Sequence, residues 1–279
     1  MKKLNPIRLG FMLITFLASY RRMARLKRKL YTLGKRAQTE QIVMDYVYSF
    51  RHGSSFYINT KVGAVFHISA SYERAPIDYS MRLFSGGNCL FIDVGAFLGA
   101  YSVLAARMGC RVLAFEPNPL TAVLLRNNLE AAKVKERVIL IQKGLWDKEG
   151  SSLLALRAAG SSLTQAHQIL VPTKQKIVYT PIELTTLDKI YSERRELFEG
   201  RRVIMKVDVE GAALRVVRGA LRAIEETKPH AIFEVHRGEG DDDELRALPY
   251  FLKMGYRWKV LEYKRPLNFI LALEPPAST

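Results

Sequence analysis

From Cys89 onward, short apolar runs alternate along the chain with longer segments of helical periodicity. The runs are 89–94, 111–115, 138–142, 203–209 and 231–235. They lack polar alternation, which is typical of strands that are covered on both faces inside a parallel sheet. The segments between them place apolar residues on one side of a helix, as over 211–226. This succession predicts an α/β fold with a doubly wound, mostly parallel sheet.

The last part of the chain breaks this alternation. Residues 256–263 and 268–273 are strand-like runs joined by a short turn around Pro266, which leaves no room for a crossover helix. We therefore expect them to pair as an antiparallel hairpin at the end of the sheet. Such an addition is typical of Rossmann-like methyltransferases and distinguishes them from dinucleotide dehydrogenases.

The segments before residue 89 follow a different pattern. Residues 38–52 have the spacing of a helix, and the runs 56–59 and 64–68 flank a short turn like a small hairpin. A short helix is expected near 77–84.

Charge is concentrated at the amino end. Residues 1–36 carry 11 Lys or Arg and no acid, so about +5 of the net charge of +16 belongs to the other 243 residues. Apolar residues recur there at helical spacing, but the uncharged stretch 9–20 has only 12 residues, too short to cross a bilayer. Three interpretations stay open: a helix that packs on its own domain or on a twin subunit, a helix on an anionic membrane surface, and a nucleic-acid arm.

The two cysteines, Cys89 and Cys110, each lie at an apolar run that predicts a buried strand. No pairing pattern or metal spacing such as C-x-x-C is present. We expect two reduced core thiols and hence a reducing compartment.

A candidate cofactor loop follows the first run. Asp93 ends the strand, and Gly95 and Gly99 allow a sharp turn and a close helix start. A dinucleotide fingerprint would need glycines at positions 97 and 100, which hold Phe97 and Ala100. S-adenosylmethionine carries no pyrophosphate, so the Phe97 side chain would not obstruct its binding. The Asp93 carboxylate suits the cationic amino-acid group of this cofactor. The loop therefore predicts an S-adenosylmethionine site, with plain turn chemistry as the alternative.

The next two strands extend this site. Glu116 ends the second run, where an acid can accept hydrogen bonds from both ribose hydroxyls of an adenosine. After the third run, Leu145 and Asp147 could flank adenine and accept from its exocyclic amine, or form an ordinary turn.

These motifs resemble those of the FkbM family of methyltransferases over roughly residues 56–240. The matching stretches are 91–96, 114–119, 144–147, 160–163, 186–188, 205–212 and 233–236. The resemblance implies a class I methyltransferase fold with a mostly parallel seven-stranded sheet, and it places Pro117 and Asn118 in the cofactor site. Phe97 departs from the usual Asn of the family, and Ala213 stands where family members usually have an acid. We predict a basic helical extension over 1–50, a lead-in hairpin and helix over 51–88, and a methyltransferase domain over 89–279.

Ionisable residues gather at the ends of the fourth and fifth runs. Lys206, Asp208 and Glu210 alternate along one strand, and Glu234 and His236 along the next. Strand interiors rarely carry such groups without a reason. His236 or Asp208 could be a general base supported by Lys206 and Glu234, or Asp208, Glu234 and His236 could hold a divalent metal. Asp208 is also a candidate cofactor-binding residue. The third interpretation is a salt-bridge network centred on Lys206.

The resemblance implies methyl transfer to a hydroxyl of a sugar, glycan or small metabolite. An exocyclic-nitrogen methyltransferase would carry an Asn/Asp-Pro-Pro-Tyr loop where Asp208-Val209-Glu210-Gly211 stands. The alternatives are an RNA methyltransferase, suggested only by the basic amino end, and a non-catalytic membrane-surface adaptor. We expect the protein in the cytoplasm, either free or bound peripherally to the inner face of the membrane. The alternatives of a monomer and a homo-oligomer both stay open.

Overall fold

The computed structural model describes residues 45–49, 55–59, 73–157, 160–162, 178–209, 211–235, 243–265 and 268–276. The chain divides into two units, Met1–Met44 and Asp45–Thr279, and the described residues belong to the second. The basic segment 1–36, with its three interpretations, lies outside the described residues, as do Glu210 and His236.

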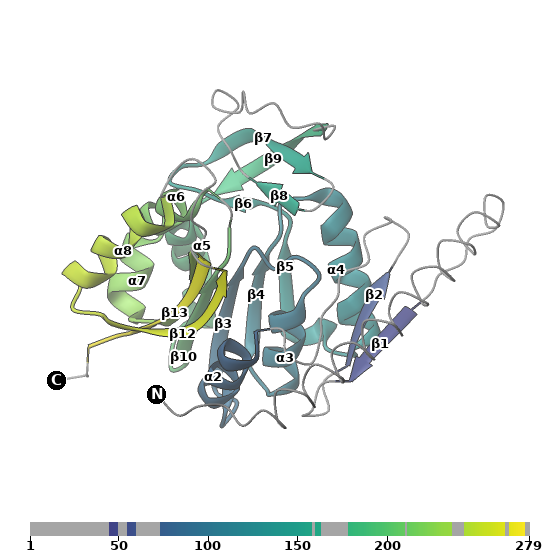
Figure 1. Ribbon diagram of the computed structural model, residues 1–279, viewed down its shortest axis with the longest axis horizontal. Coiled ribbons are helices and arrows are strands. Elements are labelled where there is room, and N and C mark those ends of the chain that lie inside the picture. The colour runs from purple at the N-terminus through teal and green to yellow at the C-terminus, as the bar shows by residue number, and fades with distance from the viewer. Residues whose placement is uncertain are drawn as a thin grey trace, which may run out of the picture. The chain divides into compact units, whose positions relative to one another are not determined.

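A seven-stranded sheet forms the centre of the second unit, in the order β12-β13-β11-β10-β3-β4-β5 (Figure 1). Its strands are β3 (Cys89–Val94), β4 (Arg111–Phe115), β5 (Val138–Ile141), β10 (Arg202–Val207), β11 (His230–Val235), β12 (Arg257–Arg265) and β13 (Asn268–Glu274). Neighbours from β11 to β5 pair parallel, whereas β13 lies antiparallel between β11 and β12. The predicted α/β class, mostly parallel sheet and carboxyl-terminal hairpin are confirmed.

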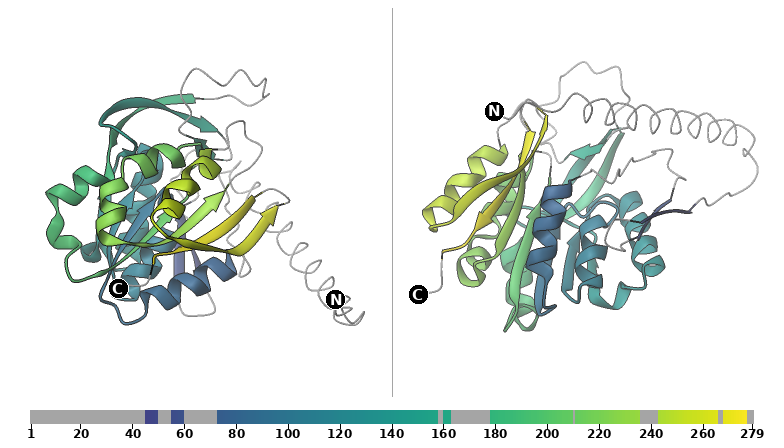
Figure 2. Two further views of the ribbon diagram at one scale, coloured as in Figure 1. Left: turned by 90° about the vertical axis from the view of Figure 1, so that its left-hand side faces the viewer. Right: turned by 60° about the horizontal axis from the view of Figure 1, so that its bottom comes forward.

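Helices cover both faces of this sheet (Figures 1 and 2). The helices α2 (Arg74–Phe84), α3 (Ala100–Arg107) and α4 (Pro119–Ala131) lie on one face, and α5 (Leu187–Glu193), α6 (Ala213–Arg218), α7 (Leu221–Thr227) and α8 (Asp243–Lys253) on the other. Strand residues alternate between the two cores: Phe91 packs with α2 and α3, and Ile92 packs with the second set. All six residues of β3 are therefore buried, which explains its continuous apolar run.

The sequence analysis did not predict a smaller, four-stranded sheet, which lies between β5 and β10 along the chain. Its strands are β6 (Gly144–Leu145), β7 (Gly150–Arg157), β8 (Gly160–Ser162) and β9 (Val178–Thr185), in the order β6-β9-β7-β8. Because β6 starts directly after the end of β5, this small sheet lies at the carboxyl edge of the large one, at the top of Figure 1.

One prediction for the lead-in segment, the helix over 38–52, was wrong. The proposed helix over 38–52 contains a strand, β1 (Asp45–Ser49), and this strand pairs antiparallel with β2 (Ser55–Asn59). The run Val47–Tyr48 is β-branched and aromatic, so it suits a strand as well as a helix face. The proposed partner 64–68 lies outside the described residues, whereas the helix expected near 77–84 is confirmed as α2.

The helix predicted over 211–226 is broken into α6 and α7 at Gly219. A Cβ atom at Gly219 would lie 1.8 Å from the carbonyl oxygen of Trp146, so only glycine allows this close approach. The Gly219 carbonyl in turn accepts from the backbone N–H of Asp188. The break thus fixes the turn after β6 against the helical layer.

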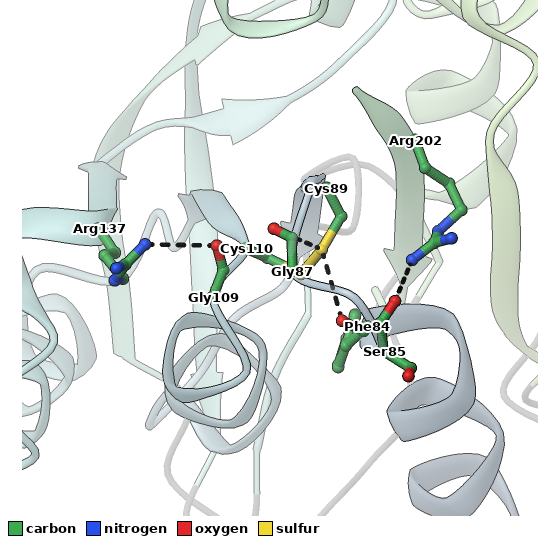
Figure 3. The surroundings of a disulfide bond; sticks show 8 residues. All are labelled: Phe84, Ser85, Gly87, Cys89, Gly109, Cys110, Arg137 and Arg202. Carbon is green, nitrogen blue, oxygen red and sulfur yellow. Dashed lines mark hydrogen bonds between the residues drawn. A yellow bond between two sulfur atoms is a disulfide. The ribbon is translucent and has the colours of Figure 1, made fainter. Parts of the chain in front are cut away.

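The expectation of two separate reduced cysteines was also wrong. Cys89 and Cys110 are buried as predicted, but they form a disulfide with a Cα–Cα distance of 4.7 Å (Figure 3). In the parallel register of β3 and β4, Leu90 lies opposite Arg111, so the preceding residues are also neighbours. The disulfide lies at the amino ends of the strands, and the inference of a reducing compartment loses its support.

Among the described helices, none is both long and apolar enough to cross a membrane.

We predict that reducing the disulfide destabilises the protein. It closes a loop of 21 residues, for which the lost chain entropy corresponds to about 3 kcal/mol. Thermal unfolding should show a lower melting temperature with reductant than without. The Cys89→Ala/Cys110→Ala variant should melt at one temperature under both conditions. Two reactive thiols in the unreduced, denatured wild-type chain would contradict the bond.

Candidate functional site

The loop between β3 and α3 is held in one shape by its glycines and by β4. The N–H groups of Gly95 and Ala96 both donate to the carbonyl oxygen of Phe115, at 3.1 and 3.0 Å. Gly95 has a φ of 81°, and a Cβ there would lie 2.1 Å from the carbonyl oxygen of Asp208. Gly99 has a φ of 87°, and a Cβ there would meet Leu125 at 2.3 Å. Both positions therefore favour glycine for conformation, and Gly95 also because the backbone of Asp208 leaves no room for a Cβ.

Glu116 closes this loop from the end of β4. Its two carboxylate oxygens accept from the N–H groups of Phe97 at 2.9 Å and Asn118 at 3.0 Å. Burial raises the pKa of Glu116 to about 7, although the two N–H bonds act in the opposite direction. Phe97, exposed, has a left-handed backbone with a φ of 51°, where the family's usual Asn is better tolerated.

Asn118 and Pro117 lie between Glu116 and α4. The Asn118 side chain accepts from the N–H of Leu120 and so caps the helix, while Pro119 occupies its first turn. Pro117 is half-buried. Both residues therefore shape the loop that carries Glu116, and any contact with a cofactor would be additional.

Asp93 is buried on the face of the sheet that α2 and α3 cover. Its Oδ2 accepts from the Ser102 hydroxyl at 2.6 Å. Burial raises the pKa of Asp93, whereas the Lys206 ammonium and the Ser102 hydroxyl oppose that rise. Lys206 lies directly opposite Asp93 in the register of β10 and β3.

Lys206 is the buried cation of this site. Its Nζ donates to Oδ2 of Asp208 at 2.6 Å and lies 4.9 Å from the centre of the Tyr101 ring. Burial alone would lower the pKa of Lys206, but the surrounding carboxylates, Asp208 first, raise it well above its ordinary value. Lys206 therefore stays protonated at neutral pH and is suited to hold neighbouring groups, not to accept a proton.

The carboxyl ends of β3, β10 and β11 bring the predicted residues together. The N–H of Asp208 donates to the carbonyl of Val94 at 3.1 Å, which fixes its backbone beside the loop. Glu234 is 4% exposed and interacts electrostatically with Lys206. His236, the other candidate base, lies outside the described residues, as does Glu210.

Leu145 and Asp147 have contacts of another kind. Leu145 is buried in the core that α5 to α8 share with the large sheet. Asp147 Oδ2 accepts from the Arg215 guanidinium of α6 at 2.7 Å, while its Oδ1 is buried without a hydrogen-bond partner among the described residues. These contacts favour structural roles for Leu145 and for Asp147, whose predicted contacts with adenine stay predictions.

Three residues of the site were missed in the sequence: Glu73, Tyr101 and Ser102. Tyr101 and Ser102 lie in the first turn of α3, directly after the glycine loop, so their position could have indicated them. Glu73 precedes α2, and its carboxylate accepts from the Tyr101 hydroxyl at 2.6 Å. No sequence pattern links Glu73 to the other residues of the site, which follow it by 20 or more positions.

The metal alternative for Asp208, Glu234 and His236 is not tested, because His236 is not described. Within the described part of the chain, no group of three His, Cys, Asp or Glu residues is arranged to hold a metal ion. The position beside Asp208 is taken by the Lys206 ammonium.

A cavity of about 400 Å³ lies elsewhere on the protein. It is lined by Tyr191, Arg195, Phe198, Glu199, Arg201, Val203, Glu226 and Thr227. Val203 is the second residue of β10, so this cavity lies at the amino edge of the sheet, opposite the glycine loop. Its Arg195 is paired with Glu226.

The residues at the carboxyl edge fit an adenosyl amino acid. Two glycines packed against Asp208 and Leu125, an acid directly after β4 and a buried acid beneath the loop lie at the carboxyl edge, where ligands of open α/β sheets bind. Together with the strand order and the antiparallel β13, they define a class I methyltransferase.

The family model described as "Methyltransferase FkbM domain" matches residues 93–258, more than half of the chain. The chain therefore belongs to the FkbM family of S-adenosylmethionine-dependent methyltransferases, and the predicted resemblance is confirmed. The match begins later and ends later than the expected 56–240.

Solved structures include similar folds at low identity. An FkbM methyltransferase from Methylobacillus flagellatus KT is 18% identical with a TM-score of 0.46, over 67% of this chain and 44% of that one. A precorrin-6y C5,15-methyltransferase from Geobacter metallireducens GS-15 is 15% identical with a TM-score of 0.43, over 78% and 94%. A tRNA m1G37 methyltransferase from M. jannaschii is 15% identical with a TM-score of 0.40, over 84% and 57%. The chain thus spans less than half of the Methylobacillus protein, and a comparison with curated proteins finds no match.

We predict that Gly95→Ala disrupts the loop. The new Cβ would collide with the Asp208 carbonyl oxygen, so unfolding free energy should fall by about 3 kcal/mol and S-adenosylmethionine binding should be lost. Gly86→Ala is the matched control, because Gly86 has a φ of 86° but open space around its Cβ position. It should lose only about 1–2 kcal/mol and keep its affinity. Equal effects of the two substitutions in denaturant titration and calorimetry would contradict the close approach.

Proposed function

We propose that this protein transfers the methyl group of S-adenosylmethionine to a hydroxyl of a sugar, glycan or small metabolite. The observation that carries the proposal is the position of Asp208. Its backbone is packed against Gly95 of the cofactor loop, and its carboxylate is held by Lys206 at 2.6 Å. An acid is thus fixed at the edge where the strands that bear the cofactor residues end.

Binding of the nucleoside depends on the loop and the two acids beside it. Glu116 is the candidate acceptor for the ribose hydroxyls, and each of its oxygens has a lone pair in addition to its bond from a backbone N–H. Asp93 is the candidate partner for the ammonium of the amino-acid part. Gly95, Gly99, Pro117 and Asn118 determine the shape of this part of the site.

At the transfer end, bound S-adenosylmethionine supplies an electrophilic methyl on a sulfonium. The protein has to orient the acceptor and remove the hydroxyl proton. Asp208 or His236 is the candidate base, and Lys206 and Glu234 are its support. Lys206, held protonated, orients Asp208 and does not take the proton itself.

Oxygen is favoured over exocyclic nitrogen by the residues after β10. The sequence Asp208-Val209-Glu210-Gly211 differs from the Asn/Asp-Pro-Pro-Tyr loop of nitrogen-directed enzymes. The small sheet next to this edge, including β8 with Gly160, Ser161 and Ser162, is the candidate surface for the acceptor.

RNA is the second candidate acceptor, because 11 basic residues lie in 1–36. The same segment supports a proposed contact with an anionic membrane surface, which would suit an adaptor without catalytic activity.

Incubation with methyl-labelled S-adenosylmethionine and extracts of the source organism tests the function. We expect label in a methyl ether of a saccharide or small metabolite, identified by mass spectrometry after mild hydrolysis. The Asp208→Asn variant should transfer far less label to the acceptor although it still binds the cofactor. Nuclease-sensitive label would indicate RNA instead. Cofactor binding without label in any fraction would favour the adaptor.

We predict that affinity for S-adenosylmethionine rises with pH through about pH 7. The pKa of Glu116 is about 7 in the free protein, and its ionised form is the better acceptor for hydroxyl groups. Between roughly pH 6 and pH 8, affinity measured by calorimetry should therefore increase up to about tenfold and then level off. Glu116→Gln should flatten this profile, whereas Glu130→Gln, an exposed change on α4, should keep it.

Glu116→Ala and Asp93→Ala should each weaken binding by roughly 1.5–3 kcal/mol, the size of a lost hydrogen bond to a charged group. Unchanged affinity in both variants would remove the assignment of the cofactor site.

A further inference from the structure

Glu73 is unusual for a residue at the start of a helix. It occupies the N-cap position of α2 with a left-handed backbone, at a φ of 47° and a ψ of 39°. Such a conformation costs a non-glycine residue roughly 1–2 kcal/mol. Its side chain makes no capping hydrogen bond and is only 2% exposed. The carboxylate is therefore directed into the protein and does not serve the helix it precedes.

Tyr101 connects Glu73 to the cation of the site. Its hydroxyl donates to Oε2 of Glu73 at 2.6 Å, while its ring lies against the Lys206 ammonium at 4.9 Å. A hydroxyl that donates to a carboxylate makes its ring richer in electrons, which strengthens the attraction to a cation on the ring face. Glu73 also acts on Lys206 directly through its charge.

Lys206 contacts both Tyr101 and Asp208 and so links Glu73 to Asp208. The ammonium is held by the Tyr101 ring and the Asp208 carboxylate, within the field of Asp93 and Glu234 as well. Four carboxylates thus act on one buried ammonium. Removing one of these negative charges changes both the position of Lys206 and the potential at the carboxyl edge.

We propose that Glu73 is a positioning residue of the transfer site, acting through Tyr101 and Lys206 on Asp208 and adding to the negative potential that a sulfonium meets there. The inference rests on the proposed function. It extends the functional unit to α2, since Glu73 lies 20 positions before the segment 93–258 that matches the family.

The sulfonium gives a readout that distinguishes this role from a structural one. S-adenosylmethionine and S-adenosylhomocysteine differ by the methyl group and its positive charge. In Glu73→Gln the side chain keeps its shape and can still accept from Tyr101, but the charge is lost. We expect affinity for S-adenosylmethionine to fall about three- to tenfold relative to S-adenosylhomocysteine, whose own affinity should stay within about twofold.

Asp78→Asn is the matched control. It removes one negative charge from the same helix, but at an exposed position beside Arg74. The ratio of its affinities for S-adenosylmethionine and S-adenosylhomocysteine should equal that of the wild type. Melting temperatures within about 3 °C of the wild type would show that both variants are folded.

Tyr101→Phe tests the connection itself. It removes the hydroxyl and keeps the ring, and it should reduce the affinity ratio in the same direction. If Glu73 acts through Tyr101, the double variant should lose less than the sum of the two single changes.

Two failures are distinguishable. A parallel loss of both affinities, or a ratio equal to that of Asp78→Asn, would overturn the role of Glu73 and leave the proposed function standing. Binding of neither nucleoside by the wild-type protein would overturn the proposed function, and this inference with it.

Discussion

The buried ammonium of Lys206 is the interaction on which the site depends. An isolated charge in a protein interior is costly, and so is each of the carboxylates near it. Together they form a hydrogen-bonded cluster in which Asp208 lies 2.6 Å from the lysine. Asp93 and Glu234, on the flanking strands, lie in the field of the same cation. The cluster thus gathers several acids at the carboxyl end of an otherwise apolar sheet.

Much of the fold was predictable because its signals are local. The parallel strands of the large sheet are mostly apolar runs, and this pattern can be recognised in the sequence without knowledge of their partners. The glycines at 95 and 99, the acid at 116 and the Lys206–Asp208 pair were also predictable, since their spacing relative to strand ends defines where they lie. The roles assigned to Leu145 and Asp147 have less support, because Leu145 is core and Asp147 faces Arg215.

What could not be predicted depends on register and on distant partners. The Cys89–Cys110 bond exists because β3 and β4 pair with these residues side by side, which spacing in the sequence does not reveal. The residues of β1 suit a helix or a strand, and their pairing with β2 makes them a strand. Glu73 meets Tyr101 across 28 positions of chain, and nothing around it in the sequence marks it as part of the site.

The two N–H bonds that Glu116 accepts have a consequence for recognition. They fix the backbone of Phe97 and Asn118 without a ligand, so the loop proposed to bind the nucleoside is already ordered in the folded protein. The entropic cost of ordering this loop is incurred during folding, so ligand binding does not incur it a second time. Preorganisation of this kind lowers the entropic cost of binding at the proposed site.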